Sequence, residues 1–497
     1  MNGSRARETV QKLWNASKSL QGGGVSYYEY VTELTYLLLL KMLAEVKKKS
    51  GPNEEAVALE MRLPEDCRWS ALKKEEGDRR LQFYKKLLVK LGDPEEVKFD
   101  LVNQVFTDAT TSLTKPTALT TLITTIDKID WYAAEEDGLG DLYEGLLEKT
   151  TSERKSKAGQ YFTPRVLIET IIQLTKPKPG EVIQDPAAGT GGFLIAAHRE
   201  ISRQTDDLMD LSPEAALFQR NEAYRGAELI TGTHRLSTMN LLLHGIETPI
   251  DCADALSSEF DGEKYKNADL ILTNPPFNKF QERVTRDGFS KTKNAAKGPL
   301  PFVEHAVRAL KDGGRAAIVL PDNFLFEDNM GRELRTWLME QCELHTILRL
   351  PVGIFYAQGV KTNVIFFTKI DEEATNSTKE VWFYDMRAQM PSFGKTRPLT
   401  EEDFAPFIKA FGDDPYGKGK RKDEGEEGRF RKFTREDIAA RNDNLDISWL
   451  REDEEDAEEG LTELDDIATA ILGHLRSALV EIEAVTEELA ETEGVEA

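Results

Sequence analysis

The sequence predicts an α/β fold: a mostly parallel sheet with helices on both faces, preceded by a helical N-terminal domain and followed by a C-terminal helical tail. Few strand patterns occur before residue 150, whereas short β-rich runs alternate with helical patterns from about residue 160 to residue 385. Alternation of strand and helix is typical of parallel sheets, because parallel neighbours need a crossover connection. In such sheets, ligands bind beyond the carboxyl ends of the strands.

Composition indicates a globular protein of more than one domain. The chain has 497 residues, of which 40% are hydrophobic. A chain of this length is too long to fold around a single hydrophobic core of ordinary size. No apolar run reaches the ~18 residues of a membrane span, and the N-terminus lacks a secretory signal pattern, so we expect a cytoplasmic protein without a membrane partner. The three cysteines lie far apart, which predicts reduced core or near-core thiols and no metal site.

Charge argues against a protein that coats nucleic acid by itself. The formal net charge is −24, and phosphate contacts need Lys and Arg. The charge is uneven, however, because Glu452–Glu459 is almost entirely acidic and Lys279–Lys297 is basic. Net charge therefore does not decide the partner.

The first domain, residues 1–150, is predicted to be helical. Tyr27–Lys49 combines helix formers, an apolar face and a cationic end, and Gly138–Glu153 has a similar pattern.

The second domain, residues 151–395, is predicted to hold the sheet. Its expected strands are short apolar runs: Glu181–Asp185, Tyr224–Leu229, Pro249–Asp254, Ala268–Asn274, Arg315–Pro321, Leu344–Pro351 and Thr362–Ile370. Helical patterns at Phe193–Ile201, Thr233–Gly245, Val303–Gly314 and Gly331–Cys342 separate them.

The remaining chain is predicted to be a polar, acidic connecting region at 396–460 and a helix at 461–497. Tyr416–Phe430 has the composition of a loop or linker. From Leu461 to Leu489, apolar residues alternate by three and four. This heptad pattern suits a partner helix for subunit docking, and it equally suits a helix packed on its own domain.

A glycine loop in Gln184–His198 follows an expected strand and opens an expected helix. Gly189, Gly191 and Gly192 allow a ligand to approach the backbone closely. The pattern matches a dinucleotide fingerprint poorly, and it is not a P-loop. Asp185, just before the loop, would repel a phosphate and attract a cationic amine, such as that of S-adenosylmethionine.

Two further acids follow expected strands. Glu228 can accept both hydroxyls of a ribose, and Asp254 can reach an adenine amino group. Such an acid is more often a helix cap when it occurs alone. Three acids on three successive strand ends favour one shared ligand.

The tetrapeptide Asn274–Phe277 ends the fourth expected strand. Its prolines remove backbone donors and fix the turn. The Asn274 side chain and the Pro275 carbonyl provide two acceptors for the N–H bonds of a planar amine, and they stabilise the positive charge that grows during transfer. Phe277 offers an apolar face to a base flipped from the duplex. This chemistry requires no metal and no covalent intermediate.

These motifs together carry a family resemblance. Asn-Pro-Pro-Phe with Asp185–Phe193 resembles amino-group DNA methyltransferases acting on adenine N6. Ala158–Ile172 resembles the block that precedes the glycine loop in methylation (M) subunits of type I restriction–modification systems, and Asn442–Leu450 is similar to their C-terminal region. The motif order is that of the γ arrangement, and the similarity covers most of the chain.

The resemblance implies a Rossmann-like class I S-adenosylmethionine-dependent fold and specific site residues. Catalysis is assigned to Asn274, Pro275, Pro276 and Phe277. Contacts to S-adenosylmethionine are assigned to Gln160, Tyr161, Phe162, Thr163, Pro164, Arg165, Thr190, Gly191, Gly192 and Glu228; the residues themselves add Asp185, Gly189 and Asp254.

The resemblance also implies partners. They are a specificity (S) subunit that sets the target sequence, a second M subunit, a restriction (R) subunit in some complexes, and double-stranded DNA with a flipped adenine. The basic segment Lys279–Lys297 is then expected to be a mobile loop that meets DNA. Two alternatives stay open: an amino-methyltransferase acting on RNA or a protein glutamine, and a non-catalytic assembly subunit that binds the cofactor.

Overall fold

The computed structural model of the chain describes residues 11–13, 15, 27–45, 47–48, 57–129, 163–248, 250–260, 262–351, 353–355, 361–370, 376–388, 390, 393, 397 and 399–450. The expected helices at 138–153 and 461–497, the acidic run at 452–459, and Gln160, Tyr161 and Phe162 lie outside the described residues.

The chain forms two compact units. The helical unit holds the described residues up to 129 together with Gly189–Gly191 and Glu228–Cys252. The sheet unit holds the described residues of Lys155–Ala188, Gly192–Ala227 and Ala253–Ala497. No helix among the described residues is long and apolar enough to cross a bilayer.

The helical unit is built around one apolar core. It contains α2 (Tyr27–Glu45), α3 (Trp69–Lys74), α4 (Gly77–Leu91), α5 (Asp100–Phe106), α6 (Pro116–Asp127) and α12 (Thr231–Leu243), with two short strands, β1 (Lys47–Lys48) and β2 (Val57–Ala58), and two 3₁₀ turns, η1 (Leu59–Arg62) and η2 (Glu65–Cys67). Leu236 and Met239 of α12 belong to this core. Arg235 secures α12 further, because its guanidinium donates to the carbonyls of Val105 and Thr107 at 2.7 and 2.6 Å.

A buried carboxylate organises the same unit. Glu33 accepts hydrogen bonds from the Tyr84 hydroxyl at 2.9 Å, the Thr111 hydroxyl at 2.6 Å and the Ser112 backbone at 2.8 Å. These donors satisfy a group whose burial would otherwise be costly. Burial still raises the pKa of Glu33 above its ordinary value.

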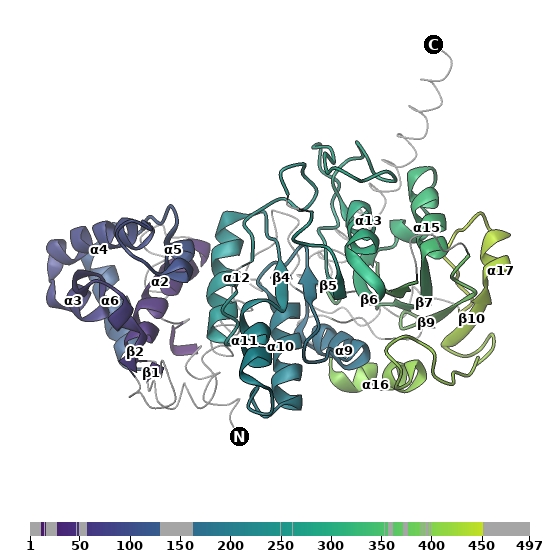
Figure 1. Cartoon of the computed structure of the whole chain (residues 1–497), viewed down its shortest axis with the longest axis horizontal. Coiled ribbons are helices and arrows are strands. Elements are labelled where there is room, and N and C mark those ends of the chain that lie inside the picture. The colour runs from purple at the N-terminus through teal and green to yellow at the C-terminus, as the bar shows by residue number, and fades with distance from the viewer. Residues whose placement is uncertain are drawn as a thin grey trace, which may run out of the picture. The chain divides into compact units, whose positions relative to one another are not determined.

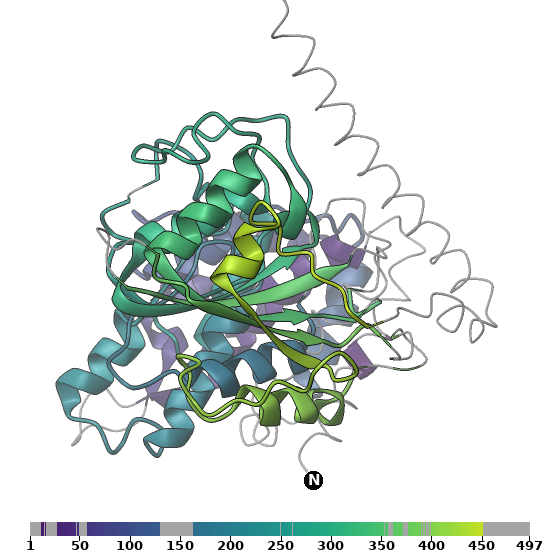
Figure 2. The same ribbon diagram turned by 90° about the vertical axis from the view of Figure 1, so that its right-hand side faces the viewer.

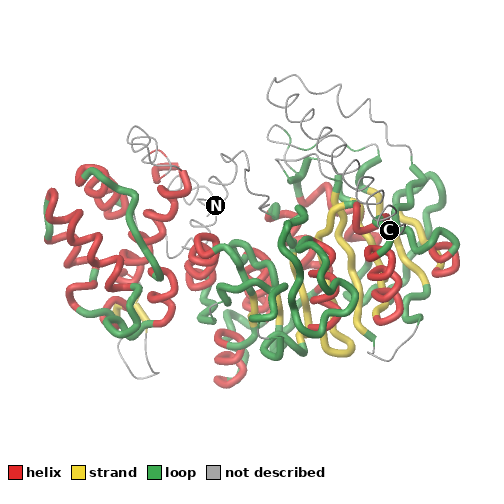
Figure 3. Tube along the Cα trace, turned by 90° about the horizontal axis from the view of Figure 1, so that it is seen from above, coloured by secondary structure: helices red, strands yellow, loops and turns green. Residues whose placement is uncertain are grey.

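The sheet unit contains one eight-stranded sheet in the order β10-β9-β7-β8-β6-β5-β3-β4. Its strands are β3 (Ile183–Asp185), β4 (Tyr224–Gly226), β5 (Ala268–Thr273), β6 (Leu310–Pro321), β7 (Cys342–Arg349), β8 (Thr362–Lys369), β9 (Glu380–Asp385) and β10 (Phe430–Thr434). Figure 3 shows them side by side. Strands β4, β3, β5 and β6 pair in parallel, so their carboxyl ends share one edge.

The sheet is mixed rather than uniformly parallel. Strand β8 pairs antiparallel with both β6 and β7. The strands β7 and β8 are consecutive, and consecutive antiparallel strands need no crossover helix. Strand β10 adds an antiparallel edge next to β9. Every residue of β8 is buried, as expected for a strand covered on both faces.

Helices cover both faces of this sheet (Figures 1 and 2). On one face lie α9 (Arg165–Thr175), α10 (Gly192–Gln204) and α16 (Glu401–Phe411), and on the other lie α13 (Pro299–Ala309) and α15 (Met330–Gln341). Shorter helices complete the unit: α11 (Pro213–Asn221), α14 (Asn323–Phe326) and α17 (Arg435–Ala439).

Two local expectations were wrong. No strand is found at Ile250–Asp254, where only Asp251 forms an isolated bridge. The Asp254 carboxylate accepts from the Leu256 backbone at 2.9 Å, which turns the chain before a ladder can continue. Cys252, expected near the core, is exposed, whereas Cys67 and Cys342 are buried.

The region expected to be polar also contributes to the sheet unit. Helix α16 buries Phe404, Phe407 and Phe411 and begins with a capping box formed by Thr400 and Asp403. Strand β10 places Phe430 against Trp382, with ring centroids 4.8 Å apart. The apolar spacing of α16 was present in the sequence, but the surrounding charges masked it.

Candidate active site

The end of β3 is held by a buried carboxylate. Asp185 is 1% exposed, and its Oδ1 accepts from the Thr273 hydroxyl at 2.7 Å and from the Ala187 backbone at 3.1 Å. Asp185 therefore fixes the carboxyl end of β5 next to that of β3. It also shapes the first turn of the glycine loop.

The glycine loop requires left-handed backbone. Gly189 and Gly191 have φ values of +55° and +84°, a region that side chains with a Cβ avoid. A Cβ at Gly189 would meet nothing within 4 Å, so there is space beside the loop. The carbonyl of Thr190 accepts from the Asn240 amide at 3.0 Å, which fixes the loop to α12.

Gly192 has a separate reason to be glycine. It opens α10, and a Cβ at this position would lie 2.9 Å from Cδ1 of Ile168 in α9. A side chain at this position would therefore displace the end of the Ile168 side chain, so glycine permits the close packing of α10 against α9.

Glu228 is connected to the glycine loop by a hydrogen bond. Its carboxylate accepts from the backbone N–H groups of Gly189 at 3.1 Å and Ile230 at 2.8 Å. Its side chain is largely buried, with 9% of the residue exposed. Burial raises the pKa of Glu228 to about 7, although the two backbone hydrogen bonds oppose the shift.

Asn274 presents an acceptor without a partner. It directly follows β5, and its Nδ2 donates to the Thr163 hydroxyl at 2.9 Å. Its Oδ1 is buried and has no hydrogen-bond partner among the described residues. A buried amide oxygen in this state costs free energy unless a donor arrives, so this atom has the properties of a ligand acceptor.

Phe277, the last residue of the tetrapeptide, is a buried aromatic side chain. It is 7% exposed, and its ring meets Phe355 edge-on, with centroids 5.5 Å apart and an interplanar angle of 86°. The edge contact defines the ring orientation that an incoming base would encounter.

Asp254 forms an ion pair. Its Oδ2 lies 2.6 Å from Nζ of Lys297, and that same ammonium lies 2.6 Å from the Glu282 carboxylate. Lys297 lies in the segment that was expected to meet DNA, and its ammonium links Glu282 of that segment to Asp254. Backbone hydrogen bonds also join the two ends of this segment: the Lys297 N–H donates to the Glu282 carbonyl, and the Phe280 N–H donates to the Lys297 carbonyl.

Other cations of the basic loop also have internal partners. Lys279 pairs with Glu327 at 3.4 Å. Arg286 donates to the Ala255 carbonyl at 2.6 Å, and its guanidinium lies over the Phe260 ring. The loop thus has several internal contacts, and its basic composition overstates the positive charge that it presents.

Sequence reasoning missed Glu304, the main anchor of this loop. Glu304 is 0% exposed, and its carboxylate accepts from the backbones of Ser290, Lys291 and Thr292 and from Arg308. These bonds hold the pKa of Glu304 below its ordinary value, although desolvation opposes them. The sequence feature that could have revealed this role is an acidic residue among the apolar residues of α13.

The block before the glycine loop is described only from Thr163 onward. Pro164 is the N-cap of α9. Arg165 pairs with Glu169 at 2.8 Å in an exposed position.

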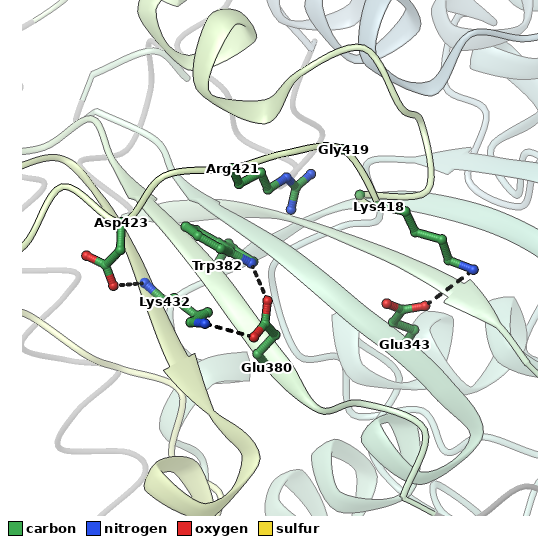
Figure 4. A pocket seen from close by; sticks show the side chains of 9 residues that line it. Glu343, Glu380, Trp382, Lys418, Gly419, Arg421, Asp423 and Lys432 are labelled. Carbon is green, nitrogen blue, oxygen red and sulfur yellow. Dashed lines mark hydrogen bonds and ion pairs between the residues drawn. The ribbon is translucent and has the colours of Figure 1, made fainter.

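A cavity of about 450 Å³ lies elsewhere, at the amino ends of β7 and β9. Figure 4 shows its charged lining, in which Lys418 faces Glu343 and Lys432 faces Glu380. It contains none of the predicted site residues. It also opens at the edge opposite to Asn274, so it is separate from the candidate site.

Two family matches together cover most of the chain. Residues 134–459 match the family described as N-6 DNA Methylase, and residues 9–126 match the HsdM N-terminal domain. The chain is 45% identical to the StySPI type I restriction enzyme methylase subunit of Salmonella potsdam, and 44% identical to the EcoKI methylase subunit of Escherichia coli (strain K12). Each alignment covers 97% of this chain and 95% of the relative.

Solved structures agree with these matches. The crystal structure of the EcoKI M protein has a TM-score of 0.55 at 41% identity, covering 97% of this chain and 96% of that one. A structure concerning complex assembly and conformational transition of the type I R-M system has a TM-score of 0.71 at 25% identity, covering 97% and 98%. The predicted Rossmann-like fold with a helical N-terminal domain is confirmed.

Proposed function

Since the chain belongs to the methylase subunits of type I restriction enzymes, within the N-6 DNA methylase family, we propose that it transfers the methyl group of S-adenosylmethionine to N6 of adenine in duplex DNA. The observation that carries this proposal is the buried Oδ1 of Asn274, which has no hydrogen-bond partner among the residues that the structure describes. An exocyclic amine is the donor that such an atom lacks.

Asn274 acts on the amine by differential binding. Its Oδ1 accepts one N–H bond of adenine N6, and the Pro275 carbonyl accepts the other. As the nitrogen forms its bond to carbon, positive charge develops on it, and both acceptors bind more strongly than in the ground state. The methyl–sulfur bond breaks as the methyl–nitrogen bond forms, so that a neutral thioether is the leaving group, and the nitrogen then loses one proton to solvent water. Phe277 orients the flipped base through its ring.

The glycine loop and the acids support S-adenosylmethionine as the cofactor. The space beside Gly189 and the acceptor capacity of Glu228 are compatible with its ribose. Asp254 remains the proposed acceptor for its adenine amine, which would have to share the carboxylate with Lys297. When bound, the cofactor supplies an electrophilic methyl group. Gln160, Tyr161, Phe162, Pro164, Arg165 and Asp185 complete the proposed set.

We assign the chain to a cytoplasmic complex with an S subunit, a second M subunit and, in a restricting form, an R subunit. Three free cysteines fit a reducing cytoplasm, and a formal net charge of −24 fits a subunit that leaves target recognition to another chain. Target choice then resides in the S subunit, and both modification and restriction depend on the assembled complex.

The decisive experiment uses the chain alone and co-expressed with its S subunit. Each preparation is incubated with methyl-labelled S-adenosylmethionine and with duplex DNA, RNA or cell protein. We expect label in DNA, located at adenine N6 after nucleoside analysis, and dependent on the S subunit. Label in RNA or in protein glutamine would establish the alternative substrates. Cofactor binding without transfer to any acceptor would establish a non-catalytic assembly subunit.

A further inference from the structure

The contact between Thr163 and Asn274 gives Thr163 a role that differs from the one implied by resemblance. The two residues are 111 positions apart, and the Thr163 hydroxyl accepts the Asn274 Nδ2–H at 2.9 Å. This contact uses Nδ2 of the Asn274 amide, which is a donor and therefore cannot accept an N–H bond from an amine. The opposite end, Oδ1, is the buried atom without a described partner.

Orientation of this amide decides whether it can act. An asparagine side chain has one acceptor oxygen and one NH₂ donor group at nearly equivalent positions. If the amide rotated by half a turn, its NH₂ group would face the N–H bonds of the adenine amine, and two donors would oppose each other. A hydroxyl can accept or donate; in the arrangement found here the Thr163 hydroxyl accepts from Nδ2, and this leaves Oδ1 for the substrate amine.

Thr163 is itself held rigidly enough to do this. Pro164 follows it, and a residue before proline is restricted to extended backbone. Helix α9 then begins at Arg165 and buries Leu167, Ile168 and Ile171 in the sheet unit. The hydroxyl is thus carried by an element packed on the sheet, while Asn274 is carried by β5 of that sheet.

We propose that Thr163 is a positioning residue that orients the Asn274 amide, so that its Oδ1 faces the substrate amine. The proposal rests on the proposed methyltransferase function. It predicts a defect in the chemical step. A cofactor contact, the role that resemblance implies for Thr163, predicts weaker S-adenosylmethionine binding.

Two matched pairs of variants separate these roles in the complex with the S subunit. Thr163→Val removes the acceptor at constant shape, and Thr163→Ser keeps it. Thr163→Ala compared with Thr163→Ser repeats the test at smaller volume, should the valine variant fold poorly. The readouts are S-adenosylmethionine affinity by calorimetry and single-turnover methylation of duplex DNA at saturating cofactor.

We expect the valine and alanine variants to lose roughly tenfold in the methylation rate, the effect of about one well-placed hydrogen bond. Affinity for the cofactor should stay within about twofold, and Thr163→Ser should keep the wild-type rate. Lost affinity with an unchanged saturated rate would overturn the proposal in favour of a cofactor contact. Wild-type behaviour of the valine variant would also overturn it. If the wild-type complex transfers no methyl group, the proposed function itself fails.

Discussion

The ammonium group of Lys297 lies 2.6 Å from the carboxylate of Asp254, which joins the loop after Asn274–Phe277 to a residue proposed to contact the cofactor. Both side chains are mostly shielded, with 14% and 17% of each side chain exposed. A hydrogen-bonded ion pair in such a position contributes more than an exposed one.

Removing this ammonium should loosen the loop. Lys297→Met leaves Asp254 and Glu282 without their shared partner, at a cost of about 1–3 kcal/mol. We expect faster hydrogen exchange in residues 278–297 and a lower melting temperature. Lys293→Met, at an exposed position in the same loop, is the control. Equal exchange in both variants would show that the ion pair does not hold the loop.

Replacing Asn274 should separate binding from chemistry. Asn274→Ala removes the proposed transition-state acceptor, and we expect methyl transfer to fall by roughly 10²–10³-fold. Affinity for S-adenosylmethionine should stay nearly unchanged, because the amide serves the substrate base. Single-turnover transfer and equilibrium dialysis measure the two effects. A comparable rate in the variant would remove this residue from the mechanism.

Cofactor affinity should depend on pH through Glu228. Its pKa is raised to about 7 by burial, and only the ionised form offers full acceptor capacity to two ribose hydroxyls. We expect affinity for S-adenosylmethionine to rise between about pH 6 and pH 8, and Glu228→Gln to flatten this dependence while weakening binding. An unchanged pH profile in the glutamine variant would assign the titration to another group.

The raised pKa of Glu228 has the opposite effect on folding stability, which falls as the pH rises. An unfolded glutamate titrates near ~4.3, so the folded chain holds the Glu228 proton more tightly. The contribution of this group to stability is complete below about pH 4.3, and it is lost as pH rises through about 7. Glu228→Gln should therefore unfold at a higher denaturant concentration than wild type at pH 8, with a smaller difference at pH 5.

The backbone of Gly191 permits a matched strain experiment. Gly191 and Gly180 both have φ of +84°, so alanine at either position costs about 1–2 kcal/mol. Gly191→Ala should weaken S-adenosylmethionine binding by roughly 5–30-fold, because the ligand requires the strained loop. Gly180→Ala should destabilise the chain similarly and bind normally. Weakened binding in both would indicate a general effect of stability.

Truncation after Leu450 should separate assembly from cofactor binding. Every proposed cofactor contact lies between Gln160 and Asp254, so affinity for S-adenosylmethionine should be retained. The heptad pattern from Leu461 to Leu489 is expected to dock the S subunit. Co-purification with S should therefore fall, and DNA methylation with it. If the truncated chain co-purifies with the S subunit in full yield, the docking role is wrong and the segment is a helix packed on its own domain.

The sequence by itself determined the strand and helix alternation and the glycine loop, and it supplied the hypothesis for the chemistry of Asn274–Phe277. These features are local: periodicity, turn residues and side-chain type are written within short segments. The same local reading placed a strand at Pro249–Asp254 and found no helix at Glu401–Phe411. In the first case a side chain turned the backbone, and in the second apolar residues were dispersed among charges.

Only the tertiary structure decided which groups meet. The Thr163 hydroxyl reaches the Asn274 amide, Glu304 gathers the backbone of the basic loop, and Lys297 pairs with Asp254. Each contact depends on sheet order, helix packing and loop closure, because partners distant in sequence become neighbours only after the strands have paired. Burial then changes the chemistry as well, since the raised pKa of Glu228 follows from its surroundings and not from its residue type.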